Sequence, residues 1–255
     1  MKQDSPQAKH LVALLKRLGA AHSVELPPQR DPVTQMVVSF LQWEATRKQA
    51  EKALERLLGV MVDINELRVS FEHEILDALG RDYPRAQERV ARMRESLNEV
   101  YRREHAMEMR SIAGKNKKEQ RAYLDTLPGI TPYVAAQVML LSLGGHALPV
   151  DQKLVALLAS EKVVEPDTPP EQAEAQLLRQ IKADQTLHVH LLLQAWSDAT
   201  KSVPTASGAG ARASGRGSAK AAGRSSGGKK AQAVRTAASA KKKPAQRSAK
   251  RSKKK

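Results

Sequence analysis

The residues with the clearest capacity for chemistry lie around a Pro-Gly turn in the middle of the chain. Residues 127–132 read Leu-Pro-Gly-Ile-Thr-Pro, and Gly129 predicts a tight turn because only glycine adopts φ > 0 without strain. Thr131 followed by Pro132 predicts a helix start, in which a capping oxygen precedes a residue already fixed at helical φ. The backbone amides of such a start favour a bound anion, so this segment is a candidate phosphate site.

Asp151 is the second candidate, because it follows Pro149 and a Gly-Gly break at residues 144–145. From the residues alone, its carboxylate is either a plain helix N-cap or a catalytic group, and the N-cap is the commoner case. Tyr133 lies near the start of the helix that is predicted to follow the Pro-Gly turn. It either lines a nucleotide pocket or packs between helices.

The elements that must position these residues are all predicted to be helical. A capping side chain precedes a proline at four places, and each pair predicts a helix start: Ser5-Pro6, Asp31-Pro32, Thr131-Pro132 and Thr168-Pro169. Between these starts the apolar residues recur at helical spacing, and no strand pattern is found. The sequence therefore predicts an all-α body of about ten helices with short connections.

Charge divides the 255 residues into two parts. Residues 201–255 hold 17 of the 43 Lys and Arg residues and no Asp or Glu, whereas residues 1–200 have a net charge of −1. The tail is rich in Ala, Ser and Gly, so it is predicted to be disordered and to attract polyanions. The absence of cysteine excludes disulfides and thiolate metal sites, and no apolar run is long enough to span a membrane.

Residues 127–135 and the Asp that follows them resemble the helix-hairpin-helix glycosylase superfamily, which includes endonuclease III and the adenine and thymine-mismatch DNA glycosylases. The family pattern is Leu-Pro-Gly-hydrophobic-Gly, a variable residue, a catalytic Lys or its replacement, Thr-Ala, and later Val-Asp. Here the hairpin reads Leu-Pro-Gly-Ile-Thr-Pro-Tyr-Val-Ala, and Asp151 follows Tyr133 by eighteen residues. Residues 41–46, Leu-Gln-Trp-Glu-Ala-Thr, resemble the end of the family's first barrel helix.

The resemblance covers residues 5–199 and implies an all-α fold of two helical lobes. The implied barrel lobe spans residues 31–135 and includes the first half of the hairpin. Residues 136–200 are expected to complete the hairpin and form the C-terminal lobe, on which the helix within residues 1–30 packs. Residues 201–255 form the basic tail.

The resemblance also implies roles in catalysis. The family Asp stabilises the sugar cation or activates water as the base leaves, and this role falls on Asp151. The family Lys forms the Schiff base needed for strand cleavage, but its position holds Tyr133, and a phenol forms no iminium. Thr131 replaces the second hairpin glycine, and Glu44 stands where a Gln fills the gap left by a flipped base. The cysteines that hold an iron–sulfur cluster are missing, so no cofactor is expected.

We therefore expect a DNA-binding protein of the base-excision-repair type, a monofunctional DNA N-glycosylase without lyase activity. The alternative is a catalytically degenerate protein that binds or compacts DNA through its hairpin and tail. The expected partner is double-stranded DNA, contacted by a monomeric, cytoplasmic and nucleoid-associated protein that binds no membrane. The expected DNA contacts come from the hairpin, the gap-filling position, nearby lysines and the tail: Leu127, Pro128, Gly129, Ile130, Thr131, Pro132, Glu44, Lys115, Lys117, Lys118, Lys153, Lys241, Lys242 and Lys243.

Overall fold

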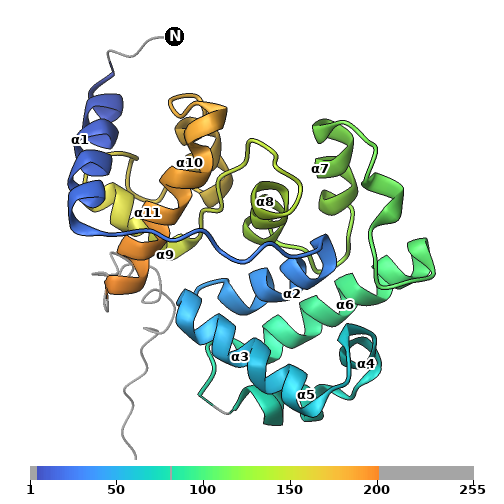
Figure 1. Cartoon of the computed structure of the whole chain (residues 1–255). Coiled ribbons are helices and arrows are strands. Elements are labelled where there is room, and N and C mark those ends of the chain that lie inside the picture. Colours follow the sequence, from blue (N-terminus) through green and yellow to red (C-terminus); the bar gives the residue numbers. More distant parts are fainter. Residues whose placement is uncertain (1–4, 81, 201–255) are drawn as a thin grey trace, which may run out of the picture. The chain divides into compact units, whose positions relative to one another are not determined.

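The computed structural model describes residues 5–80 and 82–200, and every regular element in these ranges is helical (Figure 1). This confirms the predicted all-α class. The elements in chain order are α1 (Pro6–Ala21), α2 (Pro32–Gln42), α3 (Arg47–Val60), α4 (Ile64–Val69), α5 (Glu72–Leu79), α6 (Ala86–Glu104), the short 3-10 helix η1 (Arg110–Ile112), α7 (Lys117–Asp125), α8 (Pro132–Leu141), α9 (Gln152–Ser160), α10 (Pro170–Leu178), η2 (Ala183–Gln185) and α11 (Thr186–Ala199). The basic tail, for which disorder is predicted, lies outside the described residues.

Three of the four predicted helix starts are confirmed by their capping bonds. The side chains of Ser5, Asp31 and Thr131 each accept a hydrogen bond from a backbone N–H of the first turn. In each case a proline is the first helical residue, where its missing N–H costs nothing.

The fourth predicted start is wrong by one residue. The helix α10 begins at Pro170, its N-cap is Pro169, and no side chain caps it. Pro169 precedes a second proline, which disfavours helical backbone at Pro169 and holds it extended, with ψ at 142°. The hydroxyl of Thr168 donates instead to the carbonyl of Glu165 at 2.7 Å.

The first hydrophobic core is built around α2 and α8, which pack against each other near the centre of Figure 1. Almost every residue of each helix is buried, including the polar Gln35, Ser39 and Gln42 of α2, whereas α8 is apolar on nearly all sides. The amphipathic helices α3 and α6 pack against α2, α5 packs against α3 and α6, and all three add their apolar faces to the same core. The loop at the end of α2 and the turn before α8 are therefore both attached to this buried helix pair.

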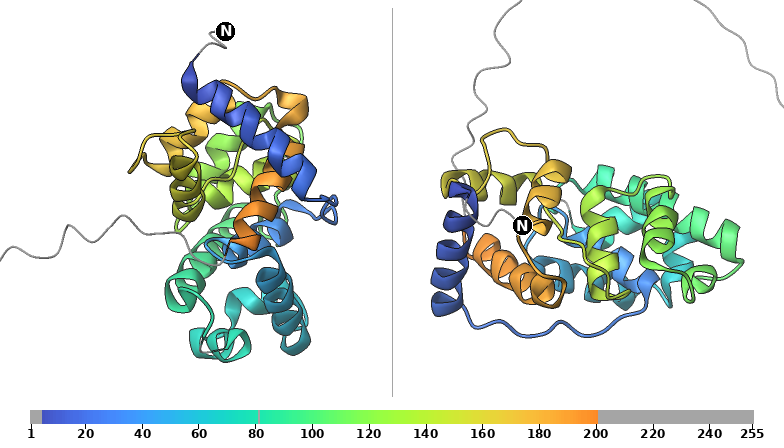
Figure 2. Two further views of the ribbon diagram at one scale, coloured as in Figure 1. Left: turned by 90° about the vertical axis from the view of Figure 1, so that its left-hand side faces the viewer. Right: turned by 90° about the horizontal axis from the view of Figure 1, so that it is seen from above.

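The second hydrophobic core joins the two ends of the described chain. It contains the leucines of α1 together with apolar side chains of α9, α10 and α11. Figure 2 shows α1, in dark blue, crossing α11, in orange, and the two helices are in contact. Asp151 lies directly before α9. In this part of the sequence, Ala147 belongs to the first core and Leu148 to the second. The lobe boundaries remain a prediction.

No helix in the described ranges is long and apolar enough to cross a membrane.

Candidate functional site

The hairpin turn between α7 and α8 has the backbone that its sequence predicts. Gly129 has φ at 75°, and a Cβ atom at this position would lie only 2.4 Å from the carbonyl oxygen of Arg92 on α6. Glycine is therefore required both by the turn and by the close approach of another backbone. Thr131 Oγ1 accepts a hydrogen bond from the N–H of Val134 at 3.3 Å. The hydroxyl that replaces the second family glycine thus caps α8.

Asp151 is the N-cap of α9, as predicted. Its Oδ1 accepts a hydrogen bond from the N–H of Leu154 at 2.8 Å, and the residue is 9% exposed. Burial raises the pKa of the Asp151 carboxyl, while the backbone N–H groups of Leu154 and Glu44 oppose that rise. Active sites often contain a nearly buried carboxylate with a perturbed pKa. The catalytic role of Asp151 itself remains a prediction.

Tyr133 lies in the first turn of α8 and is 4% exposed. Burial raises the pKa of its phenol well above the usual range, and the carboxylates of Asp151 and Asp198 raise it further. The phenol is therefore neutral at physiological pH. Asp151 thus affects the ionisation of Tyr133, although eighteen residues separate the two in sequence.

Glu44 lies in the loop between α2 and α3, with left-handed backbone at φ 56°. Its carboxylate pairs with the Nε of Arg85 at 3.1 Å. Burial raises the pKa of Glu44, the positive charge of Arg85 lowers it, and the carboxylate of Asp151 raises it. The predicted gap-filling residue and the predicted catalytic residue are thus near each other, and Arg85 offsets the negative charge of Glu44.

Arg89 on α6 is a site residue that the sequence analysis missed. Its side chain is fully buried, and its guanidinium donates hydrogen bonds to three backbone carbonyls at the end of α2, those of Phe40, Leu41 and Trp43. It thereby places a positive charge at the negative end of the α2 dipole. Its bond to the carbonyl of Trp43 also attaches it to the loop that carries Glu44. The available signal was its position four residues before the buried Met93, on the inner face of the predicted helix.

The lysines predicted to contact DNA differ in their surroundings. The three at the start of α7 are exposed: Lys115, Lys117 and Lys118. The ammonium of Lys117 donates to the carbonyl of Leu143. The half-buried Lys153 donates to the carbonyl of Ser197 at 2.5 Å, so a phosphate contact by Lys153 would have to replace this bond. Lys241, Lys242 and Lys243 lie outside the described residues.

The described part of the chain holds no ready-made metal site. It contains no cysteine, and among residues 5–80 and 82–200 no cluster of three or more His, Asp or Glu side chains could hold a metal ion.

Comparison with known proteins identifies similarity only at the level of structure. No family model matches the sequence, and no curated protein matches it. The structure is similar to an endonuclease III trapped as a covalent intermediate with DNA, at a TM-score of 0.56 and 18% identity, over 73% of this chain and 82% of that one. It is also similar to a thermostable thymine-DNA glycosylase, at a TM-score of 0.55 and 17% identity, over 78% of this chain and 88% of that one.

A third similar structure is the 8-oxoguanine glycosylase/lyase of Clostridium acetobutylicum in complex with double-stranded DNA. Its TM-score is 0.58 at 15% identity, over 76% of this chain and 70% of that one. The predicted likeness to endonuclease III and related glycosylases is thus confirmed at the level of the backbone. The chain has the fold of these helix-hairpin-helix DNA glycosylases.

Proposed function

We propose that the chain is a base-excision-repair type protein, a monofunctional DNA N-glycosylase that acts on a damaged or mismatched base flipped out of double-stranded DNA. The observation that carries the proposal is the nearly buried carboxylate of Asp151, which is held at the start of α9 by the hydrogen bond that it accepts from the N–H of Leu154. The shared fold of three DNA glycosylases supports the same reading.

In the proposed reaction the N-glycosidic bond breaks, and the base leaves with the bonding electron pair. The carboxylate of Asp151 stabilises the positive charge that develops on the sugar, an interaction that is stronger in a site of low dielectric. A water molecule then adds its oxygen to the sugar carbon, and its proton balances the charge on the departing base. Asp151 must be ionised for this role, so its raised pKa predicts loss of activity in acid.

The proposal excludes strand cleavage by a Schiff base. Such cleavage needs an amine at the sugar carbon, and the family position for that amine holds the neutral phenol of Tyr133. The closest amine in sequence to Asp151 is that of Lys153, which is engaged by the carbonyl of Ser197. We therefore expect an intact strand with an abasic site as the product.

We assign the grip on DNA to the hairpin and the lysines around it. The start of α8 carries the partial positive charge of a helix N-terminus, which suits a backbone phosphate. The exposed lysines at the start of α7 add sequence-independent attraction, and the tail of residues 201–255 adds more through its 17 basic residues. A single chain supplies all of these elements, so we propose a monomer that acts at the nucleoid in the cytoplasm.

A catalytically degenerate protein that binds or compacts DNA is the second candidate. One observation favours it: Asp151 and Tyr133 are only 9% and 4% exposed, which leaves little of either residue open to a nucleotide. In this case the hairpin and the tail would still bind DNA, but no base would be released.

The deciding experiment is a panel of duplexes, each with one damaged or mismatched base, incubated with the full chain and then treated with alkali. Alkali-labile breaks on at least one duplex, absent for Asp151→Asn, are the expected result. Binding without breaks on any duplex would favour the degenerate protein. Borohydride treatment should trap no covalent adduct with the wild-type chain, and a trapped adduct would contradict the monofunctional assignment.

A further inference from the structure

A polar stripe along α6 contacts two parts of the candidate site, the Trp43–Glu44 loop and the hairpin between α7 and α8. Its five residues are spaced alternately by three and four positions, which places them on one face of the helix: Arg89, Arg92, Ser96, Glu99 and Arg103. The stripe runs for about 21 Å along the helix axis, at 1.5 Å per residue. None of these five residues belongs to the site predicted from the sequence.

One end of the stripe holds the loop that carries Glu44. Arg89 donates to the carbonyl of Trp43 at 2.5 Å, and the guanidinium of Arg92 lies 5.8 Å from the centre of the Trp43 ring. Arg85, just before α6, stacks on the same ring at 4.9 Å and pairs with Glu44. The loop is thus attached to α6 by its backbone, its aromatic ring and its carboxylate.

The middle of the stripe holds the tip of the hairpin. Gly129 approaches the backbone of Arg92 so closely that a Cβ atom would lie 2.9 Å from the Cα of Arg92. One helical turn further on, the buried Ser96 donates its hydroxyl proton to the carbonyl of Pro128 at 2.7 Å. Arg92 therefore touches the loop with its side chain and the hairpin with its backbone.

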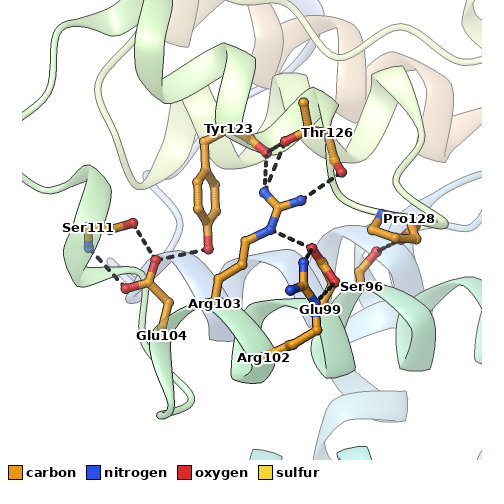
Figure 3. A network of polar contacts seen from close by, with 9 residues as sticks. All are labelled: Ser96, Glu99, Arg102, Arg103, Glu104, Ser111, Tyr123, Thr126 and Pro128. Carbon is orange, nitrogen blue, oxygen red and sulfur yellow. Dashed lines mark hydrogen bonds and ion pairs between the residues drawn. The ribbon is translucent and has the colours of Figure 1, made fainter.

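The far end of the stripe holds the hairpin through Arg103 (Figure 3). The guanidinium donates to the hydroxyl of Thr126 at 3.0 Å and to the carbonyl of Thr126 at 2.9 Å. It also lies over the ring of Tyr123, 5.0 Å from its centre. The carboxylate of Glu99 fixes the opposite side of the guanidinium, at 2.6 Å from Nε. Thr126 ends α7, so the positive charge of Arg103 also stabilises the negative end of that helix.

We propose that α6 sets the position of the hairpin relative to the Trp43–Glu44 loop, and that Arg103 is the positioning residue that holds the hairpin in place for DNA. Arg103 acts through the backbone of Thr126, one residue before the Leu-Pro-Gly turn. Its contribution to hairpin order stands independently, and its contribution to DNA recognition rests on the proposed function.

The first test is hydrogen exchange of the hairpin amides in the full-length chain. Arg103→Met should increase exchange at Leu127 and Ile130 about tenfold, because it removes both bonds to Thr126 and the contact with Glu99. Arg102→Met is the matched control, because Arg102 pairs with the same Glu99 but its side chain is 71% exposed. Arg94→Met, which breaks the ion pair from α6 to Glu72 on α5, controls for a general loss of stability. Both controls should leave the two amides unchanged.

The second test compares a duplex containing a tetrahydrofuran abasic-site analogue with an undamaged duplex. Arg103→Met should lower the preference for the abasic duplex about tenfold and leave binding to the undamaged duplex within twofold, because the tail dominates that binding. Arg103→Lys should recover only part of the preference, since an ammonium cannot bridge both Thr126 oxygens and Glu99 as a planar guanidinium does.

The outcomes of the two tests separate the inference from the proposed function. Unchanged exchange at Leu127 and Ile130 in Arg103→Met, or equal acceleration in the Arg94→Met control, overturns the role of Arg103. A wild-type chain with no preference for the abasic duplex contradicts the proposed function, and the exchange data still decide the inference. Should Arg103→Met fail to fold, Arg103→Lys keeps the charge but cannot hold both Thr126 oxygens and Glu99, so it should still accelerate exchange at Leu127 and Ile130, and unchanged exchange in it overturns the role of Arg103.

Discussion

Two substitutions of Asp151 separate its role as a helix cap from its role as a charge. In the wild-type chain the N–H of Leu154 lies 2.8 Å from Oδ1 of Asp151. In Asp151→Asn the side-chain oxygen can still accept this hydrogen bond, because Asn and Asp cap helices almost equally well. In Asp151→Ala both the cap and the charge are lost. The difference in unfolding free energy between the two variants therefore measures the cap alone.

We expect Asp151→Ala to be less stable than Asp151→Asn by about 1 kcal/mol, the usual value of an N-cap side chain. For a folded body of this size, that difference lowers the midpoint of thermal unfolding by about 2–4 °C. The wild-type chain should be less stable than Asp151→Asn at neutral pH. Burial raises the pKa of Asp151, so its stabilising contribution is present below pH 3.8 and is lost as the pH rises through the folded pKa.

Excision should fall by at least about 100-fold in both variants, because each removes the charge that stabilises the sugar cation. Thermal unfolding of the three proteins at neutral pH and single-turnover excision on a reactive duplex measure the two effects separately. Excision by Asp151→Asn within twofold of the wild-type rate would refute the catalytic role. Equal stability of the Ala and Asn variants would refute the capping argument.

Three further predictions follow from charge and burial. Arg89→Met should destabilise the fold by about 3 kcal/mol in urea unfolding, because three backbone carbonyls at the end of α2, two of them in buried hydrogen bonds, lose a charged donor; a loss below 1 kcal/mol would contradict this. Burial lowers the pKa of His190 to about 4, so about 3 kcal/mol of stability should be lost as the pH falls from 6.5 to 4. His190→Gln should flatten that part of the pH profile, and an unchanged profile would exclude His190 as its source. Removal of residues 201–255 should weaken DNA binding equally for all sequences and reduce its salt dependence, by about 0.9 in slope per lost phosphate contact, whereas unchanged affinity would exclude the tail.

The parts of the fold that depend on local chemistry could be predicted from the sequence. A capping oxygen followed by proline predicts that a helix begins at that proline. The helix starts predicted after Asp31 and Thr131 are confirmed for this reason. Asp151 caps α9 without a following proline, and its position after Pro149 and the Gly-Gly break predicts that helix start. The start at Thr168 failed because a second proline shifted the boundary, a local effect that the sequence already contained.

The parts that depend on distant contacts could not be predicted. Charged residues recur along α6, and the sequence does not show that Arg89 meets the carbonyls at the end of α2 while the adjacent Glu88 is exposed. The pairing of Glu44 with Arg85 is of the same kind, since 41 positions separate the two residues. The sequence predicts that Gly129 forms a turn. It does not predict the second constraint on Gly129, the close backbone of Arg92, because that contact depends on how α6 packs.

The second hydrophobic core has a consequence for synthesis of the chain. Leu11, Leu14 and Leu18 of α1 find their partners among residues 148–193, so they have nothing to pack against until almost the whole body has left the ribosome. At about 5–20 residues per second this interval lasts roughly 9–35 s. During that time α1 presents an apolar face to solvent, whereas the core around α2 can begin to assemble with the helices that directly follow it. Binding of a chaperone to the nascent chain should therefore concentrate on the first twenty residues and end when α11 emerges.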